Sequence, residues 1–86
     1  MLKITSKHSG ERLVTLKLEG RIVGEWAGLL EQECLHHLSR QRRIRLDLRA
    51  VSFITESSVE VLRGLIGRGV EISGASVLID SLLNES

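Results

Sequence analysis

A short segment near the middle of the chain alternates strictly between apolar and charged side chains. Ile44, Leu46 and Leu48 are separated from one another by Arg45 and Asp47. A strand that is buried on both faces reads as an unbroken apolar run, whereas a strand with one wet face alternates with a period of two. The segment therefore predicts a β-strand in a sheet that helices cover on one face and leave open on the other.

The remaining patterns predict three more strands and three helices. We expect strands at residues 2–5, 13–19 and 70–72, and helices over about 25–39, 56–67 and 77–83. Turns are expected at residues 7–10, which make the first two strands an antiparallel hairpin, and at 73–76. Glycines bracket a loop at residues 21–23. The prediction is one α/β domain over residues 1–86, with a four-stranded mixed sheet and the order β-β-α-β-α-β-α.

Apolar spacing also predicts which helical residues face the core. The first helix should bury the stripe Trp26, Leu29, Leu30, Cys34 and Leu38. The second should bury Val59, Leu62 and Ile66, flanked by Val61 and Leu65, and should end at Gly67 and Gly69, the latter in a left-handed conformation. Ser76 is placed to cap the third helix.

Charge gathers on the side of the sheet that we expect to be open. Lys17, Glu19, Arg43, Arg45 and Asp47 should lie on this open face. It is either a solvated face, in which Glu19, Asp47 or Glu71 pairs with the arginines, or a binding surface for a small ligand or nucleic acid. No stacking aromatics are interleaved with the arginines, which favours the first interpretation.

Composition excludes several classes of protein. The chain has 86 residues, 42% of them hydrophobic and 27% charged, which is typical of one small globular domain. Its net charge of +1 provides no field that would recruit nucleic acid. A single cysteine, Cys34, fits a reducing compartment, and neither a signal peptide nor a membrane span is expected. We therefore expect a cytoplasmic protein that does not insert into membranes.

Four consecutive polar residues, 55–58, separate the central strand from the second helix, and we call them the junction. Thr55 is placed to cap the helix by accepting from the backbone amide of Ser57 or Ser58. Glu56 falls in the first turn, where the helix dipole favours a negative charge by about 0.3–1 kcal/mol. The junction is either only a well-made helix start or a functional surface.

Residues on both sides of the junction are similar to those of the STAS domain, the fold of bacterial anti-anti-sigma factors. Leu46-Asp47-Leu48 and Val51-Ser52-Phe53-Ile54 precede the junction, and Gly69-Val70-Glu71-Ile72 and a leucine-rich last helix follow it. The segment Gly20-Arg21-Ile22 resembles the family's Gly-x-Leu. The resemblance is strongest over residues 44–83, and it indicates a small stand-alone member.

The junction departs from the family's Asp-Ser-Ser/Thr-Gly sequence. Aligned without gaps, Thr55 takes the place of the aspartate, Glu56 that of the phosphorylated serine or threonine, and Ser58 that of the glycine. A glutamate has one negative charge, whereas a phosphoserine has roughly −1.5 to −2. The resemblance thus implies a site without the phosphorylation switch. A one-residue slip would instead make Ser57 the phosphate acceptor, but it requires an insertion after Phe53.

Family resemblance implies a protein-binding module, not an enzyme. The expected partner is an anti-sigma-type kinase, another signalling protein, or the ATPase of an ABC-type lipid transporter, of which the chain would be an accessory subunit. The resemblance places the loop after the second strand beside the junction. The candidate partner-binding residues are Thr55, Glu56, Ser57, Ser58, Arg21, Val23 and Glu25. Homodimerisation through the open face is a further alternative.

Other candidate sites have weaker support. Cys34 and His37 share a helix face and are metal-ligand types, but no second pair completes a tetrahedron, so we expect a buried thiol and exposed His36 and His37. The glycines 64, 67 and 69 close a helix, whereas a dinucleotide fingerprint opens one. No catalytic triad or cofactor motif is visible, and we expect neither a cofactor nor a metal.

Overall fold

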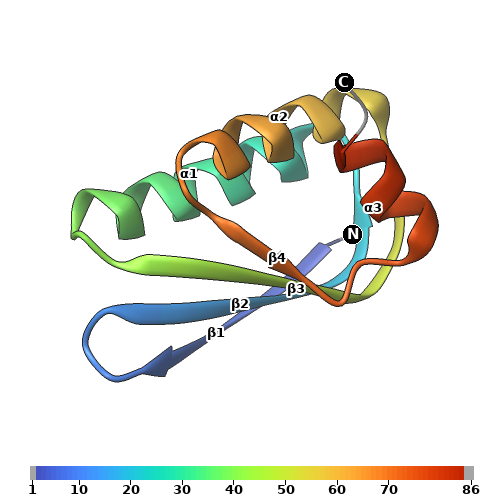
Figure 1. The fold of residues 1–86 in the computed structure, drawn as a ribbon. Coiled ribbons are helices and arrows are strands. Elements are labelled where there is room, and N and C mark those ends of the chain that lie inside the picture. Colours follow the sequence, from blue (N-terminus) through green and yellow to red (C-terminus); the bar gives the residue numbers. More distant parts are fainter. Residues whose placement is uncertain (1, 85–86) are drawn as a thin grey trace.

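Four strands and three helices follow one another in the expected order in the computed structural model, which describes residues 2–84. They are β1 (Leu2–Ser9), β2 (Leu13–Ile22), α1 (Glu25–Ser39), β3 (Arg43–Ile54), α2 (Glu56–Gly67), β4 (Glu71–Ser73) and α3 (Val77–Asn84). Figure 1 shows α1 and α2 lying together on one face of the sheet, with the other face left open. The prediction from the alternating central strand is confirmed.

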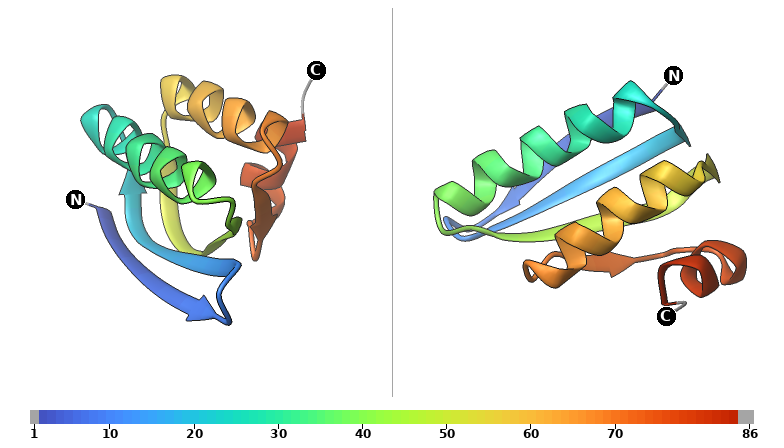
Figure 2. Two further views of the ribbon diagram at one scale, coloured as in Figure 1. Left: turned by 90° about the vertical axis from the view of Figure 1, so that its left-hand side faces the viewer. Right: turned by 90° about the horizontal axis from the view of Figure 1, so that it is seen from above.

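The sheet is mixed, with strand order β1-β2-β3-β4. β1 and β2 form the expected antiparallel hairpin, and β2, β3 and β4 are parallel to one another. β1 is one edge of the sheet, whereas α3 lies on the side of β4, the other edge (Figure 2). Because parallel strands run in the same direction, the carboxyl ends of β2 and β3 lie together at one end of the sheet.

The core is made almost entirely of aliphatic side chains from both layers. Val14, Leu16 and Leu18 of β2 are fully buried, and Ile44 and Leu46 of β3 lie beside them in register. From the helices, the buried apolar side chains are Ala27, Leu30, Cys34, Val59, Leu62, Leu65, Ile79 and Leu83. This shared core fixes the helices over the sheet and holds their first turns near the ends of the strands.

Three strand boundaries differ from the predicted ones. β1 continues to Ser9, so residues 7–9 are strand and the turn lies at residues 10–12. β2 continues through Arg21 and Ile22, which were expected in a loop. β4 is shifted by one residue, to 71–73. In each case pairing with a neighbouring strand extends or shifts an element whose own side-chain pattern gives no clear end.

Helix faces also differ from those predicted. Leu29 is 49% exposed and Ile66 37% exposed, so both lie outside the core, while Leu38 is only half-buried. His37, expected in solvent, is 4% exposed. The buried line of α1 is residues 27, 30, 34 and 37, and that of α2 is residues 58, 59, 62 and 65. Each helix is rotated slightly from the most apolar orientation because it packs against both the sheet and the other helix.

The end of α2 has the expected glycine geometry. Gly69 has φ +99, in the left-handed region. Its N–H donates to the Ile66 carbonyl at 2.9 Å, and the Val70 N–H donates to the Leu65 carbonyl at 3.1 Å. These two bonds are the Schellman arrangement, which satisfies carbonyls that have no partner within the helix.

Candidate functional site

The junction begins α2 through a set of hydroxyl contacts. Thr55 Oγ1 accepts a hydrogen bond from the backbone N–H of Ser58 at 3.4 Å, as predicted for the N-cap. The same oxygen lies 2.8 Å from Ser58 Oγ and 3.3 Å from Ser57 Oγ. The Thr55 N–H in turn donates to the Ile22 carbonyl at 3.1 Å, which ties the helix start to the end of β2.

Only part of the junction faces solvent. Glu56 and Ser57 are exposed and Thr55 is half-buried, whereas Ser58 has no exposed surface. The prediction that Ser58 contacts a partner is therefore wrong. Ser58 lies on the buried line of α2 with Leu62 and Leu65, at positions i, i+4 and i+7. That spacing is visible in the sequence and could have placed Ser58 in the core.

The loop after β2 lies beside the junction, as the family resemblance implied. Arg21 pairs with Phe53 and Ile22 with Ile54 in the parallel register of β2 and β3. Arg21 and Glu25 are exposed, and Val23 is half-buried. The structure thus brings the predicted residues of both segments to one end of the sheet.

Phe53 belongs to this surface, although the sequence pattern did not indicate it. Its side chain is 45% exposed, and the Arg21 guanidinium carbon lies 5.0 Å from the ring centroid. An Arg within about 6 Å of an aromatic face makes a favourable cation–π contact. Phe53 and Arg21 therefore form an exposed aromatic–cationic pair. Phe53 comes three residues before Glu56 in the chain.

Two irregularities in β3 turn Phe53 outward. The register between β2 and β3 shifts between Lys17 and Glu19 and again between Gly20 and Arg21, each time adding one residue to β3. Beyond Leu48 the buried residues of β3 are accordingly spaced by three, at residues 48, 51 and 54. Bulges re-aim side chains in this way near functional sites. The apolar spacing Leu48, Val51, Ile54 is the signal that could have identified Phe53 as exposed.

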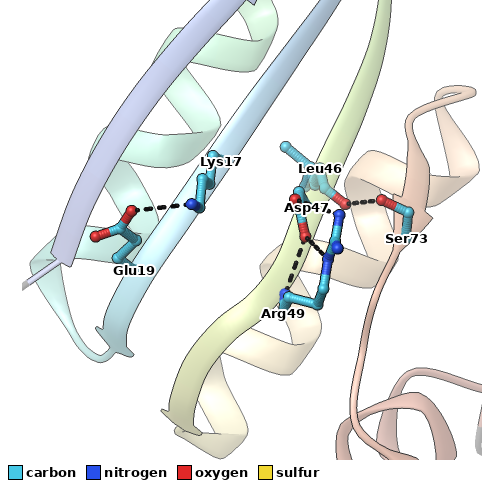
Figure 3. Close-up of polar contacts among 6 residues, drawn as sticks. All are labelled: Lys17, Glu19, Leu46, Asp47, Arg49 and Ser73. Atoms are coloured by element: carbon cyan, nitrogen blue, oxygen red, sulfur yellow. Dashed lines mark hydrogen bonds and ion pairs between the residues drawn. The ribbon is translucent and has the colours of Figure 1, made fainter.

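The arginines of the open face are largely paired. Arg43 lies 2.8 Å from Glu71 Oε1, and Arg45 lies 3.5 Å from Glu71 Oε2. Figure 3 shows Lys17 paired with Glu19 at 3.5 Å, and Asp47 with Arg49 at 3.4 Å. These contacts agree with the solvated-face interpretation.

Asp47 is also held by the backbone. The Arg49 N–H donates to Asp47 Oδ1 at 3.0 Å, and this hydrogen bond lowers the pKa of the Asp47 carboxyl below its usual range, with help from the Arg49 guanidinium. On the adjacent backbone, the Ser73 hydroxyl donates to the Leu46 carbonyl at 3.4 Å and links β4 to β3 (Figure 3). Asp47 therefore keeps its negative charge on the open face and neutralises Arg49.

The other end of the molecule contains a buried histidine. Arg42 donates to Nδ1 of His37 at 3.1 Å, and Nε2 of His37 lies 3.3 Å from Glu33 Oε1. Burial lowers the pKa of His37, against the opposing effect of Glu33. Burial also raises the pKa of the Cys34 thiol to about 12, helped by the neighbouring carboxylates of Glu33 and Glu31.

Cys34 and His37 are not part of a group of three potential metal ligands in the described part of the chain. Within residues 2–84, no three histidine, cysteine, aspartate or glutamate side chains are grouped so that they could hold a metal ion. Cys34 and His37 share a helix face, as their spacing indicated, but both are buried, whereas His37 was expected in solvent. No helix among these residues is long and apolar enough to cross a membrane.

Comparison with known proteins identifies the fold. No family model matches the sequence, and no curated protein matches it significantly. An anti-sigma factor antagonist from Mycobacterium paratuberculosis aligns with a TM-score of 0.70 at 16% identity, over 84% of this chain and 64% of that one. The chain therefore spans less than two thirds of that protein's length.

Two further solved structures have the same architecture. The STAS domain of an anti-sigma factor antagonist from Rhodobacter sphaeroides aligns with a TM-score of 0.61 at 21% identity, covering 85% of this chain and 86% of that one. The anti-sigma factor antagonist SpoIIAA, in its unphosphorylated form, aligns with a TM-score of 0.68 at 11% identity, covering 91% and 79%. The chain has the STAS fold, as its sequence resemblance indicated.

Proposed function

We propose that this STAS-fold chain is a non-enzymatic module that binds another protein through the start of α2 and the adjoining end of β2. The proposal rests on one observation: an exposed aromatic residue, Phe53, lies under Arg21 and close in the chain to the exposed carboxylate of Glu56. Aromatic residues and arginine are the side chains most enriched at energetic centres of protein interfaces. The fold shared with anti-sigma factor antagonists supports the same kind of function.

The proposed interface is made of exposed or half-exposed side chains at one end of the sheet. It consists of Arg21, Val23, Glu25, Phe53, Thr55, Glu56 and Ser57. Ser58 contributes only indirectly, because its buried hydroxyl fixes the position of Thr55 and thus the direction of the first turn. A partner that docks here meets a surface whose backbone is fixed by the strands and by the helix cap.

Glu56 gives this surface a constant negative charge. It lies in the first turn of α2, where a negative charge interacts favourably with the positive end of the helix dipole. At that position, a serine or threonine would gain a charge of about −1.5 to −2 when a kinase phosphorylates it, whereas the charge of a glutamate would stay the same. The proposed module is therefore not switched by phosphorylation at residue 56.

Ser57 is the one exposed hydroxyl next to Glu56, and it is the alternative phosphate acceptor. Its Oγ lies 3.3 Å from Thr55 Oγ1, so a phosphate there would disturb the N-cap. The test is incubation of the protein with ATP and a lysate of its native cells, followed by mass spectrometry. Unmodified Ser57 supports a site whose charge is not switched by phosphorylation, and stoichiometric phosphate on Ser57 contradicts it.

Affinity capture from native cells tests the binding surface. Glu56→Lys should remove the captured partner, because it reverses the charge at the centre of the interface. Glu11→Lys makes the same change in net charge at an exposed position in the distant β1–β2 turn, and it should retain the partner. A partner that both variants retain contradicts the proposal.

The same experiment separates the rival functions. Arg43→Glu combined with Arg45→Glu should leave the partner bound, since both arginines already pair with Glu71. Loss of a nucleic acid or small ligand in this double variant alone would favour the arginine-rich face instead. The nature of the captured protein decides among a kinase, another signalling protein and a transporter ATPase.

A further inference from the structure

β1 presents an unpaired strand edge over eight residues. β2 pairs with it along its whole length on one side, and no described strand lies on the other. β4, at the opposite edge, has only three residues, and α3 lies on its side of the sheet (Figure 2). A long, uncovered edge has backbone donors and acceptors available for one more strand.

A shallow groove runs along this edge on the helix-covered face. It has a volume of about 370 Å³ and is lined by Ile4 and Ser6 of β1 and by Leu29, Gln32 and Glu33 of α1. Leu29 is 49% exposed and Ile4 is half-buried, so the groove offers apolar surface between the strand and the helix. Alternate side chains of an added strand would enter this groove, because they point to one face of the sheet.

On the open face, the same edge is positively charged. The register places Lys3 opposite Glu19 and Lys7 opposite Thr15. Glu19 is 3.5 Å from Lys17, and no ion pair involves Lys3 or Lys7 among residues 2–84. These two lysines lie four residues apart along one strand face, about 13 Å at the usual rise per residue.

From these observations we infer that β1 is a docking site for an extended segment of another protein in which apolar and acidic residues alternate. The segment adds to the sheet as a fifth strand beside β1. Its apolar side chains cover Ile4 and Leu29 in the groove, and carboxylates four residues apart meet Lys3 and Lys7. This surface is separate from the start of α2, so the inference does not depend on the proposed function.

A second copy of the chain fits the same edge poorly. If two β1 strands paired antiparallel about Thr5, Lys3 of each copy would lie opposite Lys7 of the other. Like charges placed directly opposite one another across a strand pair are destabilising. Lysines on an exposed edge are a known protection against such self-pairing. In this register the charge pattern favours an acidic segment over a second copy.

A fluorescein-labelled eight-residue peptide that alternates valine and glutamate is the probe. Binding is measured by fluorescence anisotropy, and amide hydrogen exchange maps the site. We expect saturable binding, with slower exchange confined to outward-facing amides of β1. A peptide alternating valine and lysine, and one with four valines followed by four glutamates, should bind at least tenfold more weakly.

Variants of the protein test the named contacts. Lys3→Glu with Lys7→Glu should weaken binding by about tenfold or more, since two attractions become repulsions. Arg40→Glu with Arg68→Glu is the matched control: both arginines are exposed and lie in the turns after α1 and α2, and binding should stay within twofold. Leu29→Glu should also weaken binding, and Glu56→Lys should not.

Three results of the peptide experiments would overturn the inference. They are the absence of saturable binding at millimolar peptide, equal affinity for the acidic and basic peptides, and exchange protection outside β1. Concentration-dependent dimerisation that protects the β1 amides in the absence of peptide would also overturn it. In that case the edge is an interface between copies of the chain.

Discussion

Thr55 joins the helix start to the sheet through its hydroxyl and its backbone N–H. The hydroxyl caps α2 and lies 2.8 Å from the buried Ser58 Oγ, and the N–H donates to the Ile22 carbonyl. A single residue therefore sets both the direction of α2 and its distance from β2. The proposed binding surface depends on this position being fixed.

Replacing Thr55 by valine should destabilise the protein by about 1–2 kcal/mol, because it removes the N-cap and leaves the Ser58 hydroxyl without its partner. The midpoint of urea unfolding measures the change. Thr5→Val, at an exposed strand position, is the control and should change stability little. The double variant Thr55→Val with Ser58→Ala should lose less than the sum of the two single variants. Strict additivity would contradict the coupling of the two hydroxyls.

His37 makes stability depend on pH. In the folded protein its pKa is lowered by burial, and Arg42, which can only donate, makes Nδ1 an acceptor. The other groups near the ring are Glu33 and the rings of His36 and His8. The unfolded chain therefore takes up a proton at His37 more readily than the folded one, so stability is greatest above the unfolded pKa and decreases as pH falls through it.

We expect the urea midpoint to decrease between pH 7.5 and 5.5, and to decrease less in His37→Gln. His36→Gln, which changes an exposed histidine beside it, should retain the full decrease. Asp47, whose pKa is also lowered, contributes only in the much more acidic range near its own titration. An identical pH dependence in wild type and His37→Gln would show that another group is responsible.

At the scale of single elements, Gly69 just after the end of α2 and Gly64 inside it have opposite requirements. Gly69 has a positive φ, which residues other than glycine adopt only with strain. Gly64 lies inside the helix, is exposed, and has no neighbouring atom within 4 Å of an added Cβ. The first glycine is required by the turn, whereas the second only increases the flexibility of the unfolded chain.

Gly69→Ala should therefore destabilise the protein by about 1–2 kcal/mol, and Gly64→Ala should stabilise it by about 0.5–1 kcal/mol. Both changes add one methyl group, so each variant is the control for the other. Urea unfolding at neutral pH measures both. Equal effects of the same sign would contradict the assigned end of α2.

The order and type of the elements could be predicted from the sequence because each has its own apolar period. Alternation identified the one-sided sheet, and Thr55 and Gly69 marked the start and end of α2. Helix rotation could not be predicted in the same way. Leu29 is exposed and His37 is buried because the packing of α1 on the sheet decides the rotation of the helix about its axis. The apolar pattern of the helix alone does not predict that packing.

The candidate site was predictable only in part. Glu56, Ser57 and Arg21 are exposed side chains in segments that the sequence already marked. Phe53 was missed because its exposure comes from two bulges in β3, which depend on pairing with β2. Ser58 is buried despite its polar side chain, because its position on the buried line of α2 decides its burial.

At the scale of the whole molecule, charge is divided between the two layers. Within their described bounds, α1, α2 and α3 contain six carboxylates and one arginine, Arg63. The open face of the sheet has an excess of lysine and arginine over its acidic residues. A net charge of only +1 therefore conceals two oppositely charged surfaces.

Arg63 supports the α2–α3 contact on the helical side. Its guanidinium Nη2 donates to the Leu82 carbonyl at 2.6 Å, near the end of α3. α2 is therefore held at its start by the Thr55 contacts and in its second half by the contact of Arg63 with α3. This rigidity suits a preformed binding surface, because a rigid surface loses less conformational entropy on association.

The affinity of the purified partner for variants at residue 56 tests the central claim most directly. Isothermal titration calorimetry should give wild-type affinity for Glu11→Lys, weaker binding for Glu56→Gln, and no measurable binding for Glu56→Lys. This order follows if the carboxylate at the start of α2 contacts the partner and stays charged. Equal affinity of wild type, Glu56→Gln and Glu56→Lys would contradict the account, because the partner would then bind elsewhere on the molecule.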